Sequence, residues 1–255
     1  MGLISALGFL TRIPVGRRAL ETKSLARAVA YFPLVGLLLG FIIAGADYGM
    51  RLVFPELLSS AMVVALLMLF TGALHFEGFV DSCDGLFGGH SRERRLEIMR
   101  RKNVGAYAIA GGALLLLLKC AAISSLPADA GRFWVLALFP CMSRWGMALA
   151  VGLFPYARQE GLGTAFRHSS PIQIAIAGII ALMAAGLLGS TAGLILFSVA
   201  TVLALLLGYG ICRMLGGLTG DTYGAINESI EVALLLVAAG ILPSLAMEPF
   251  WRGGF

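Results

Sequence analysis

Two clusters of acidic residues are the features of this sequence whose spacing could support chemistry. The first lies in HFEGFVDSCDGLFGG, where Glu77, Asp81 and Asp84 are spaced i, i+4 and i+7. On an α-helix these side chains fall within an arc of roughly 60° on one face. Three carboxylates this close repel one another, and a divalent cation that bridges to a phosphate would remove the repulsion. Because oxygen ligands suit Mg²⁺ or Mn²⁺, the segment predicts a metal–phosphate site.

The second cluster lies in GGLTGDTYGAINESIE, where Asp221, Glu228 and Glu231 are spaced i, i+7 and i+10. On a continuous helix they span roughly 80°, and Asn227 and Thr222 add further oxygen donors beside them. The glycines of this segment let a backbone approach a phosphate or bend sharply. Together, the two clusters predict one shared site for one or two metal ions.

Two other interpretations of the acidic clusters stay open. The carboxylates could anchor helix ends at a membrane surface, or they could coordinate Na⁺ or protons in a transporter. The basic run SRERRLEIMRRK nearby either donates hydrogen bonds to an anion or forms a solvated loop that sets the orientation of the chain.

Three further polar residues are candidates for the same chemistry. Lys119 and Arg144 lie deep in apolar stretches, where a lone cation is costly, so each pairs with an acidic cluster, holds a substrate phosphate or forms a structural ion pair. His75 is a candidate general base for activating a hydroxyl group. On a straight helix it points roughly 160° away from Glu77, so a shared site requires a bend at Gly78.

The composition identifies the scaffold that must position these residues. The chain has 255 residues, is 59% hydrophobic and only 13% charged, and has a mean hydropathy of +0.90. This excludes soluble folds and predicts an all-α, polytopic integral membrane helical bundle, since a helix needs roughly 20 apolar residues to cross a bilayer. About seven spans are predicted, at Ala28–Ala46, Ser60–Val80, Gly105–Leu126, Phe133–Phe154, Pro171–Ser190, Thr191–Ile211 and Val232–Met247.

The basic residues predict the orientation of this bundle. Most of the 19 lie on the side of the N-terminus and the acidic clusters, which the positive-inside rule places in the cytoplasm. The same rule explains the net charge of +5 without a nucleic-acid partner. Residues 1–27 read as a cytoplasmic interfacial segment, and residues 1–255 as one membrane-embedded domain. The four cysteines show no paired spacing, so no disulfide or thiolate metal site is expected.

Six motifs occur in an order that resembles one known family over nearly the whole chain. They are TRIPVG, YFPLVGLLLG, HFEGFVDSCDGLFGG, RLEIM, YARQEGLG and GLTGDTYGAINESIE, and they resemble cobalamin synthases, the adenosylcobinamide-GDP ribazoletransferase family. The resemblance implies a reaction in which a hydroxyl of α-ribazole, or of its 5′-phosphate, attacks the cobinamide-linked phosphorus of adenosylcobinamide-GDP. GMP leaves, and adenosylcobalamin or its 5′-phosphate forms. It also implies dependence on Mg²⁺ and a place in the prokaryotic cytoplasmic membrane, with the active site facing the cytoplasm.

The resemblance implies that Asp81 and Asp84, followed by Asp221 and Glu228, are metal ligands, and the residues themselves suggest the remaining expected roles. Catalytic roles fall to His75, Asp81, Asp84, Lys119 and Arg144. Metal ligands are expected at Glu77, Asp81, Asp84, Asp221 and Glu228, and substrate contacts at Arg12, Arg158, Glu160 and Asn227.

Two positions depart from the family pattern, since Glu77 and Arg101 stand where aspartate is usual. The main alternative function is a membrane transporter for a corrinoid or a cation, which would need a polar path through the bilayer. Only Lys119 and Arg144 lie clearly within spans, too few to define such a path. A phospholipid-type alcohol phosphotransferase is disfavoured, because Leu86-Phe87 follow Asp84-Gly85 where that class has an Ala-Arg pair. The sequence leaves open whether the protein is a monomer or a homo-oligomer.

Overall fold

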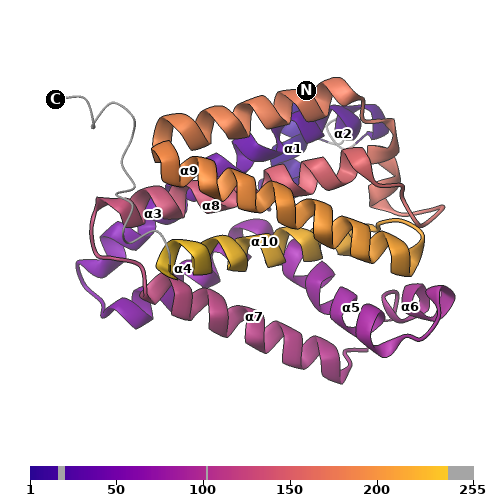
Figure 1. Cartoon of the computed structure of the whole chain (residues 1–255), viewed down its shortest axis with the longest axis horizontal. Coiled ribbons are helices and arrows are strands. Elements are labelled where there is room, and N and C mark those ends of the chain that lie inside the picture. The colour runs from indigo at the N-terminus through magenta and orange to yellow at the C-terminus, as the bar shows by residue number, and fades with distance from the viewer. Residues whose placement is uncertain (17–20, 102, 241–255) are drawn as a thin grey trace.

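The computed structural model describes residues 1–16, 21–101 and 103–240, and this part of the chain is almost entirely helical (Figure 1). The only bridge between extended segments in it is an isolated one from Tyr156 to Leu218. The all-α prediction is therefore confirmed. In chain order the elements are α1 (Gly2–Leu10), α2 (Thr22–Ala28), η2 (Val29–Tyr31), α3 (Phe32–Arg51), α4 (Glu56–Thr71), α5 (Leu74–Gly88), α6 (Arg92–Ile98), α7 (Ala106–Ser124), α8 (Ala130–Leu153), η3 (Leu162–His168), α9 (Pro171–Leu215) and α10 (Gly220–Gly240).

Helix α8 lies at the centre of the bundle and packs against α3, α9 and α10. Its apolar window, within Gly131–Leu153, is 94% buried inside the protein. Two glycines of the GLLLG sequence, Gly36 and Gly40, lie directly against the backbone of α8 at Pro140 and Ala137, and a Cβ at either position would overlap that backbone. Small residues at a helix contact thus allow the close approach that drives association within a membrane.

Five helical segments are long and apolar enough to cross a membrane: the rod formed by α2 and α3, and helices α7, α8, α9 and α10. A sixth candidate is the pair α4 and α5, which meet at an angle of 95°. Helix α9 contains one residue with non-helical dihedrals, Ser190, and Figure 1 shows its two arms doubling back on each other there. This is the hairpin predicted at Gly189-Ser190. These candidates rest on length and composition, so the count of seven spans and the cytoplasmic N-terminus stay predictions.

Two predicted boundaries were wrong. The span predicted at Ser60–Val80 is broken at Gly72 and Ala73, both left-handed, so that its second half turns away as α5. The span predicted at Val232–Met247 begins at Gly220 instead, while residues 241–247 lie outside the described part of the chain. Hydropathy hid the first turns of α10 because they are rich in polar residues, which the fold buries by pairing.

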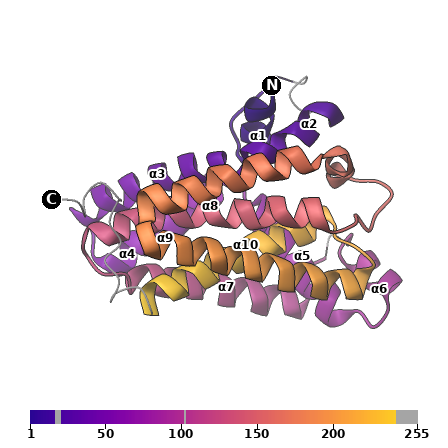
Figure 2. The same cartoon turned by 45° about the horizontal axis from the view of Figure 1, so that its top comes forward.

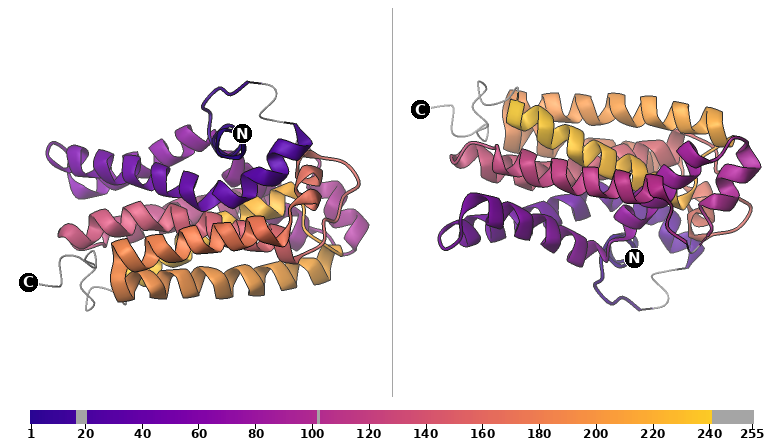
Figure 3. Two further views of the ribbon diagram at one scale, coloured as in Figure 1. Left: turned by 90° about the horizontal axis from the view of Figure 1, so that it is seen from above. Right: turned by 90° about the horizontal axis from the view of Figure 1, so that it is seen from below.

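The elements around the first acidic cluster gather at one end of the bundle. Figure 2 and Figure 3 show the long helices running side by side, with α5, α6 and the segment that joins α8 to α9 together at the same end. Helices α1 and α2 pack beside them, against each other and against η2. The fold therefore collects most of the predicted chemistry at one end.

Candidate active site

A cavity of about 230 Å³ lies at this end of the bundle, between α5, the first turns of α10, the last turns of α8 and the loop that follows α8. Its polar lining consists of His75, Glu77, Asp81, Arg158 and Asp221. Its aromatic lining consists of Phe9, Phe32, Tyr156, Phe166 and Tyr223. The structure thus brings residues from both acidic clusters to one space, as the sequence predicts.

Two glycines allow α5 and α10 to approach closely enough to form this space. A Cβ at Gly78 of α5 would lie 2.6 Å from the carbonyl oxygen of Asp221, and a Cβ at Gly224 of α10 would lie 2.9 Å from that of His75. Contacts below 3.0 Å between such atoms require the backbones to separate. Gly78 and Gly224, one in each acidic motif, are therefore needed for the packing of these two helices.

The first turn of α10 is fixed by a reciprocal cap. The backbone N–H of Thr222 donates to the Thr219 hydroxyl at 3.2 Å, and the backbone N–H of Thr219 donates to the Thr222 hydroxyl at 2.7 Å. Asp221 lies in this turn and forms an ion pair with Arg158, with Nη2 2.8 Å from Oδ2. The loop that carries Arg158 is held by backbone hydrogen bonds of 2.7 Å in both directions between residues 155–157 and Leu218.

The acids of the cavity are only partly neutralised. Three carboxylates, from Glu77, Asp81 and Asp221, face one guanidinium, from Arg158. Within the described residues Glu77 and Asp81 have no ion pair within 4 Å. The same part of the chain contains no group of three His, Cys, Asp or Glu side chains that could by itself hold a metal ion. A cation bound here would therefore take further ligands from water or a substrate, which is how Mg²⁺ commonly binds.

Asp84 lies apart from this cavity and caps helix α7. It accepts hydrogen bonds from the backbone N–H groups of Gly105 at 2.5 Å and Ala108 at 2.8 Å. A carboxylate at a helix N-terminus satisfies otherwise unpaired N–H groups and interacts favourably with the helix dipole. Each Asp84 oxygen accepts one hydrogen bond and keeps a free lone pair, and Asp84 does not line the cavity, so its role as a metal ligand beside Asp81 stays a prediction.

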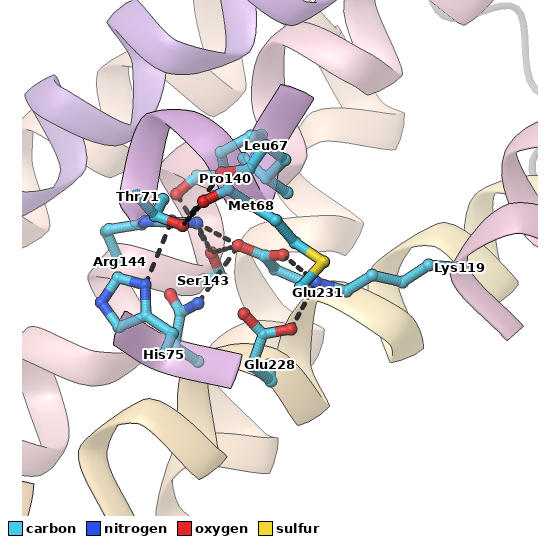
Figure 4. Close-up of polar contacts among 11 residues, drawn as sticks. Leu67, Met68, Thr71, His75, Lys119, Pro140, Ser143, Arg144, Glu228 and Glu231 are labelled. Carbon is cyan, nitrogen blue, oxygen red and sulfur yellow. Dashed lines mark hydrogen bonds and ion pairs between the residues drawn. The ribbon is translucent and has the colours of Figure 1, made fainter. Parts of the chain in front are cut away.

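Lys119 and Arg144 form a buried ion network with the distal part of the second acidic cluster (Figure 4). The Lys119 Nζ lies 2.5 Å from a carboxylate oxygen of Glu228 and 2.5 Å from one of Glu231, and Arg144 donates to Glu231. Asn227 donates to Glu231 at 3.1 Å. Two cations thus balance two anions. Of the alternatives for Lys119 and Arg144, the structure shows pairing with an acidic cluster, and it draws Glu228 and Asn227 into that network rather than into the cavity.

His75 connects the network to the cavity. Its side chain is buried, lines the cavity and has Nδ1 3.5 Å from Arg144 Nη2, while Nε2 has no hydrogen-bond partner in the described part of the chain. The bend expected at Gly78 is absent, since α5 runs from Leu74 to Gly88 as one helix, and His75 and Glu77 both line the cavity. Since a guanidinium has no acceptor, a hydrogen bond from Arg144 requires an unprotonated Nδ1, and the proton of the neutral ring is then on Nε2. This geometry suits a hydrogen-bond donor better than the expected general base.

The other expected substrate contacts do not line the cavity. Arg12 is exposed, its side chain packs over Gly72 at the start of the α4–α5 turn, and its backbone N–H donates to Phe70 at 2.8 Å. Glu160 is exposed in the loop beyond Arg158. Arg101 pairs with Glu97 at 2.7 Å on the surface.

Sequence reasoning missed most of the aromatic lining and a second ion network. At the opposite end of α8, Arg132 binds Asp47 through two hydrogen bonds of 2.8 Å and Glu56 through one of 2.7 Å. Opposite charges near the ends of neighbouring apolar stretches were the available signal for that network. Phe9, Phe32, Phe166 and Tyr223 carried no such signal, because they come from separate segments and resemble ordinary core residues.

Comparison with known proteins identifies relatives over almost the entire chain. The family model described as "Cobalamin-5-phosphate synthase" matches residues 2–239. A protein from Syntrophobacter fumaroxidans is 41% identical over 92% of this chain and 96% of its own, and one from Desulforamulus reducens is 36% identical over 91% and 93%. One from Escherichia coli is 37% identical over 90% and 96%. All three are named "Adenosylcobinamide-GDP ribazoletransferase". No solved structure matches.

Proposed function

The chain belongs to the cobalamin-5-phosphate synthase family, which catalyses the final step of cobalamin synthesis, and we propose that the cavity between α5 and α10 is its active site. There a hydroxyl of α-ribazole, or of its 5′-phosphate, attacks the cobinamide-linked phosphorus of adenosylcobinamide-GDP. The P–O bond to GMP breaks, and GMP leaves. The observation that carries this proposal is the excess of carboxylates over cations in the cavity, which calls for a positively charged ligand or partner.

We propose Mg²⁺ as that cation, with one or two of the carboxylates of Glu77, Asp81 and Asp221 as the protein groups that would hold it. Carboxylate oxygens are the ligands that Mg²⁺ prefers, and one or two of them leave positions for water and phosphate oxygens. When bound, the ion would neutralise the diphosphate and the charge that develops on the departing GMP.

The protein side chains supply positioning and hydrogen bonds for this transfer. Arg158 is the guanidinium of the cavity and is suited to a phosphate group, while its ion pair with Asp221 fixes its direction. His75 lines the cavity, and its Nε2–H, which has no hydrogen-bond partner among the described residues, would donate to a phosphate oxygen. Burial raises the pKa of Tyr156 above its ordinary value, so its hydroxyl stays protonated and can donate too. Phosphoryl transfer depends chiefly on such positioning and electrostatics.

The cavity end of the bundle is proposed to face the cytoplasm of a bacterium. Helix α6 lies at this end (Figure 2), and it and the residues just after it carry Arg92, Arg94, Arg95, Arg100 and Arg101. Basic residues beside a membrane span favour the cytoplasmic side. A soluble nucleotide-bearing substrate would then reach the cavity directly from the cytoplasm.

The experiment that tests the proposed function measures GMP release by the purified protein in lipid vesicles. The samples contain adenosylcobinamide-GDP and α-ribazole, or its 5′-phosphate, with Mg²⁺ or with EDTA. We expect GMP release and a matching corrinoid product with Mg²⁺, and loss of both with EDTA. Release that is insensitive to EDTA would contradict the metal proposal. Accumulation of corrinoid inside the vesicles without GMP release would support the transporter instead.

A further inference from the structure

Five aromatic rings from five segments form one continuous array along the cavity. Phe166 of η3 lies at its centre, with ring centroids 5.0 Å from Phe9, 5.7 Å from Phe32 and 6.4 Å from Tyr223. Tyr156 extends the array, with its ring 6.2 Å from that of Tyr223. All five residues line the cavity. The chain thus surrounds a small space with flat, apolar faces that a planar ligand could contact.

The same cavity combines this aromatic surface with charged groups. Glu77, Asp81, Asp221 and Arg158 share the lining with the rings. A nucleoside has two parts that match these two kinds of lining. Its planar base suits the aromatic rings, and its polar sugar, which leads to a phosphate or a reacting hydroxyl, suits the charged groups. Stacking of a nucleic-acid base on an aromatic side chain contributes about 1–3 kcal/mol.

The size and the polar groups of the cavity discriminate between the bases of the two substrates. At about 230 Å³ it is smaller than the roughly 300–1,000 Å³ of sites for drug-sized ligands, so it has no room for a corrin ring. No carboxamide or aliphatic hydroxyl side chain is among its described lining residues. Guanine and adenine carry N–H donors, and the carboxylates of the cavity that could accept from them are the ones proposed to hold the cation, so burying such a base here is costly. The base of α-ribazole is a dimethylbenzimidazole, which has no N–H group in the nucleoside.

We propose that the aromatic array around Phe166 binds the dimethylbenzimidazole base of α-ribazole, so that the cavity is the subsite of the attacking nucleoside. The guanine base of the other substrate then lies outside this cavity, with only the diphosphate reaching its acids. This inference rests on the proposed function of the cavity.

The test compares binding of α-ribazole and of GDP to the protein in lipid nanodiscs by titration calorimetry. In Phe166→Leu, which keeps an apolar side chain, we expect the Kd for α-ribazole to rise about tenfold and that for GDP to stay unchanged. Phe197→Leu is the matched control, because Phe197 stacks on Trp145 and does not line the cavity. It should alter neither Kd.

A second measurement avoids dependence on the folding of a core variant. Free dimethylbenzimidazole should displace α-ribazole from the wild-type protein, whereas guanosine and adenosine should not. Tyr156→Leu, in the loop, should weaken α-ribazole binding as Phe166→Leu does.

Weakened GDP binding with intact α-ribazole binding in either variant, or displacement by guanosine, would assign the array to the other substrate. If the wild-type protein releases GMP but both variants bind α-ribazole normally, the assignment of the array to the base of α-ribazole is wrong. The proposed function of the cavity would still stand. A wild-type protein that neither binds α-ribazole nor releases GMP would overturn the proposed function as well.

Discussion

The cavity and the buried ion network differ in how their charges are balanced, although helix α10 contributes to both. In the network, Lys119 and Arg144 offset Glu228 and Glu231, and all four side chains are less than 10% exposed. In the cavity, three carboxylates face one guanidinium among the described lining residues, that of Arg158. Burying an unpaired charge costs several kcal/mol, so a closed cluster must be neutral, whereas a cluster at a cavity can rely on a ligand for its neutrality. The balance of charge thus distinguishes acids that stabilise the fold through ion pairs from acids whose charge is balanced by a bound ligand.

The largest effect on activity is expected from removing one unbalanced charge of the cavity. Asp81→Asn should lower GMP release roughly 1,000-fold or more, because it removes charge at the site proposed to hold the cation. Thermal stability in detergent should not fall, since the repulsion among the acids decreases. Asp129→Asn is the matched control, because Asp129 caps α8 at the far end and asparagine caps helices equally well. Wild-type turnover in Asp81→Asn would remove this residue from the site.

His75 belongs to both regions, and its substitution tests whether the ring donates or accepts a proton. His75→Phe should lower the rate of GMP release roughly 100-fold through loss of one donor. His75→Gln should retain much of the rate, because its amide N–H reaches a position similar to Nε2 and it cannot act as a base. His90→Gln, at an exposed histidine, should match the wild type. Equal loss in the Gln and Phe variants would favour the general-base role.

A double-variant cycle tests whether neutrality is what stabilises the network. Lys119→Met leaves two carboxylates against one guanidinium and should destabilise the protein by about 3–5 kcal/mol. Adding Glu228→Gln restores the balance and keeps the pair of Arg144 with Glu231, so most of the lost stability should return. Thermal unfolding in detergent measures both changes. A double variant no more stable than the single one would show that charge balance is not the cause.

A smaller effect is expected where the two helices touch without charge. Gly78→Ala places a methyl group against the Asp221 carbonyl and should separate α5 from α10, at a cost of about 1–3 kcal/mol and a loss of activity. Gly45→Ala in α3 is the control, since a Cβ there has no neighbour within 4 Å. That variant should be at least as stable as the wild type. A Gly78→Ala protein with unchanged turnover would show that the contact does not set the geometry of the cavity.

The smallest effect is expected on the surface, where Glu97 pairs with Arg101 and Arg94. These hydrogen bonds lower the pKa of Glu97, so the pair contributes only above the pKa of the unfolded chain and is lost as pH falls through the folded value. Because the pair is exposed, Glu97→Gln should change neither melting temperature nor GMP release detectably at neutral pH. A large loss of activity would instead place Arg101, and its departure from the family pattern, in the site.

Local spacing predicted what one helix can determine by itself. Glu77 and Asp81 share a face of α5 and line one cavity, and the hairpin at Ser190 follows from two adjacent apolar stretches. Asp84 shows the limit of this reasoning, because its position on the same face was predicted but the N-terminus of α7 that engages it was not. Which helix end meets a carboxylate depends on packing between segments distant in sequence.

Tertiary packing also explains the remaining differences. The early start of α10 escaped hydropathy because its acids are neutralised by residues on other helices. The aromatic array escaped because Phe9, Phe32 and Phe166 belong to three segments with no common period. Charge pairing across a bundle and convergence of single rings leave no local pattern in a sequence.

The contacts of Gly78 and Gly224 limit where substrate can enter the cavity and where product can leave it. With a glycine of each helix against the backbone of the other, α5 and α10 cannot part without breaking a whole row of contacts, and the ion network holds α10 from behind. We therefore expect admission of substrate and escape of product to occur on the side of the Arg158 loop, which is held at the start of α10 by the Leu218 hydrogen bonds, the Arg158–Asp221 ion pair and the Tyr156–Tyr223 contact. The slow step of turnover would then be set by that loop rather than by the helices that carry the acids.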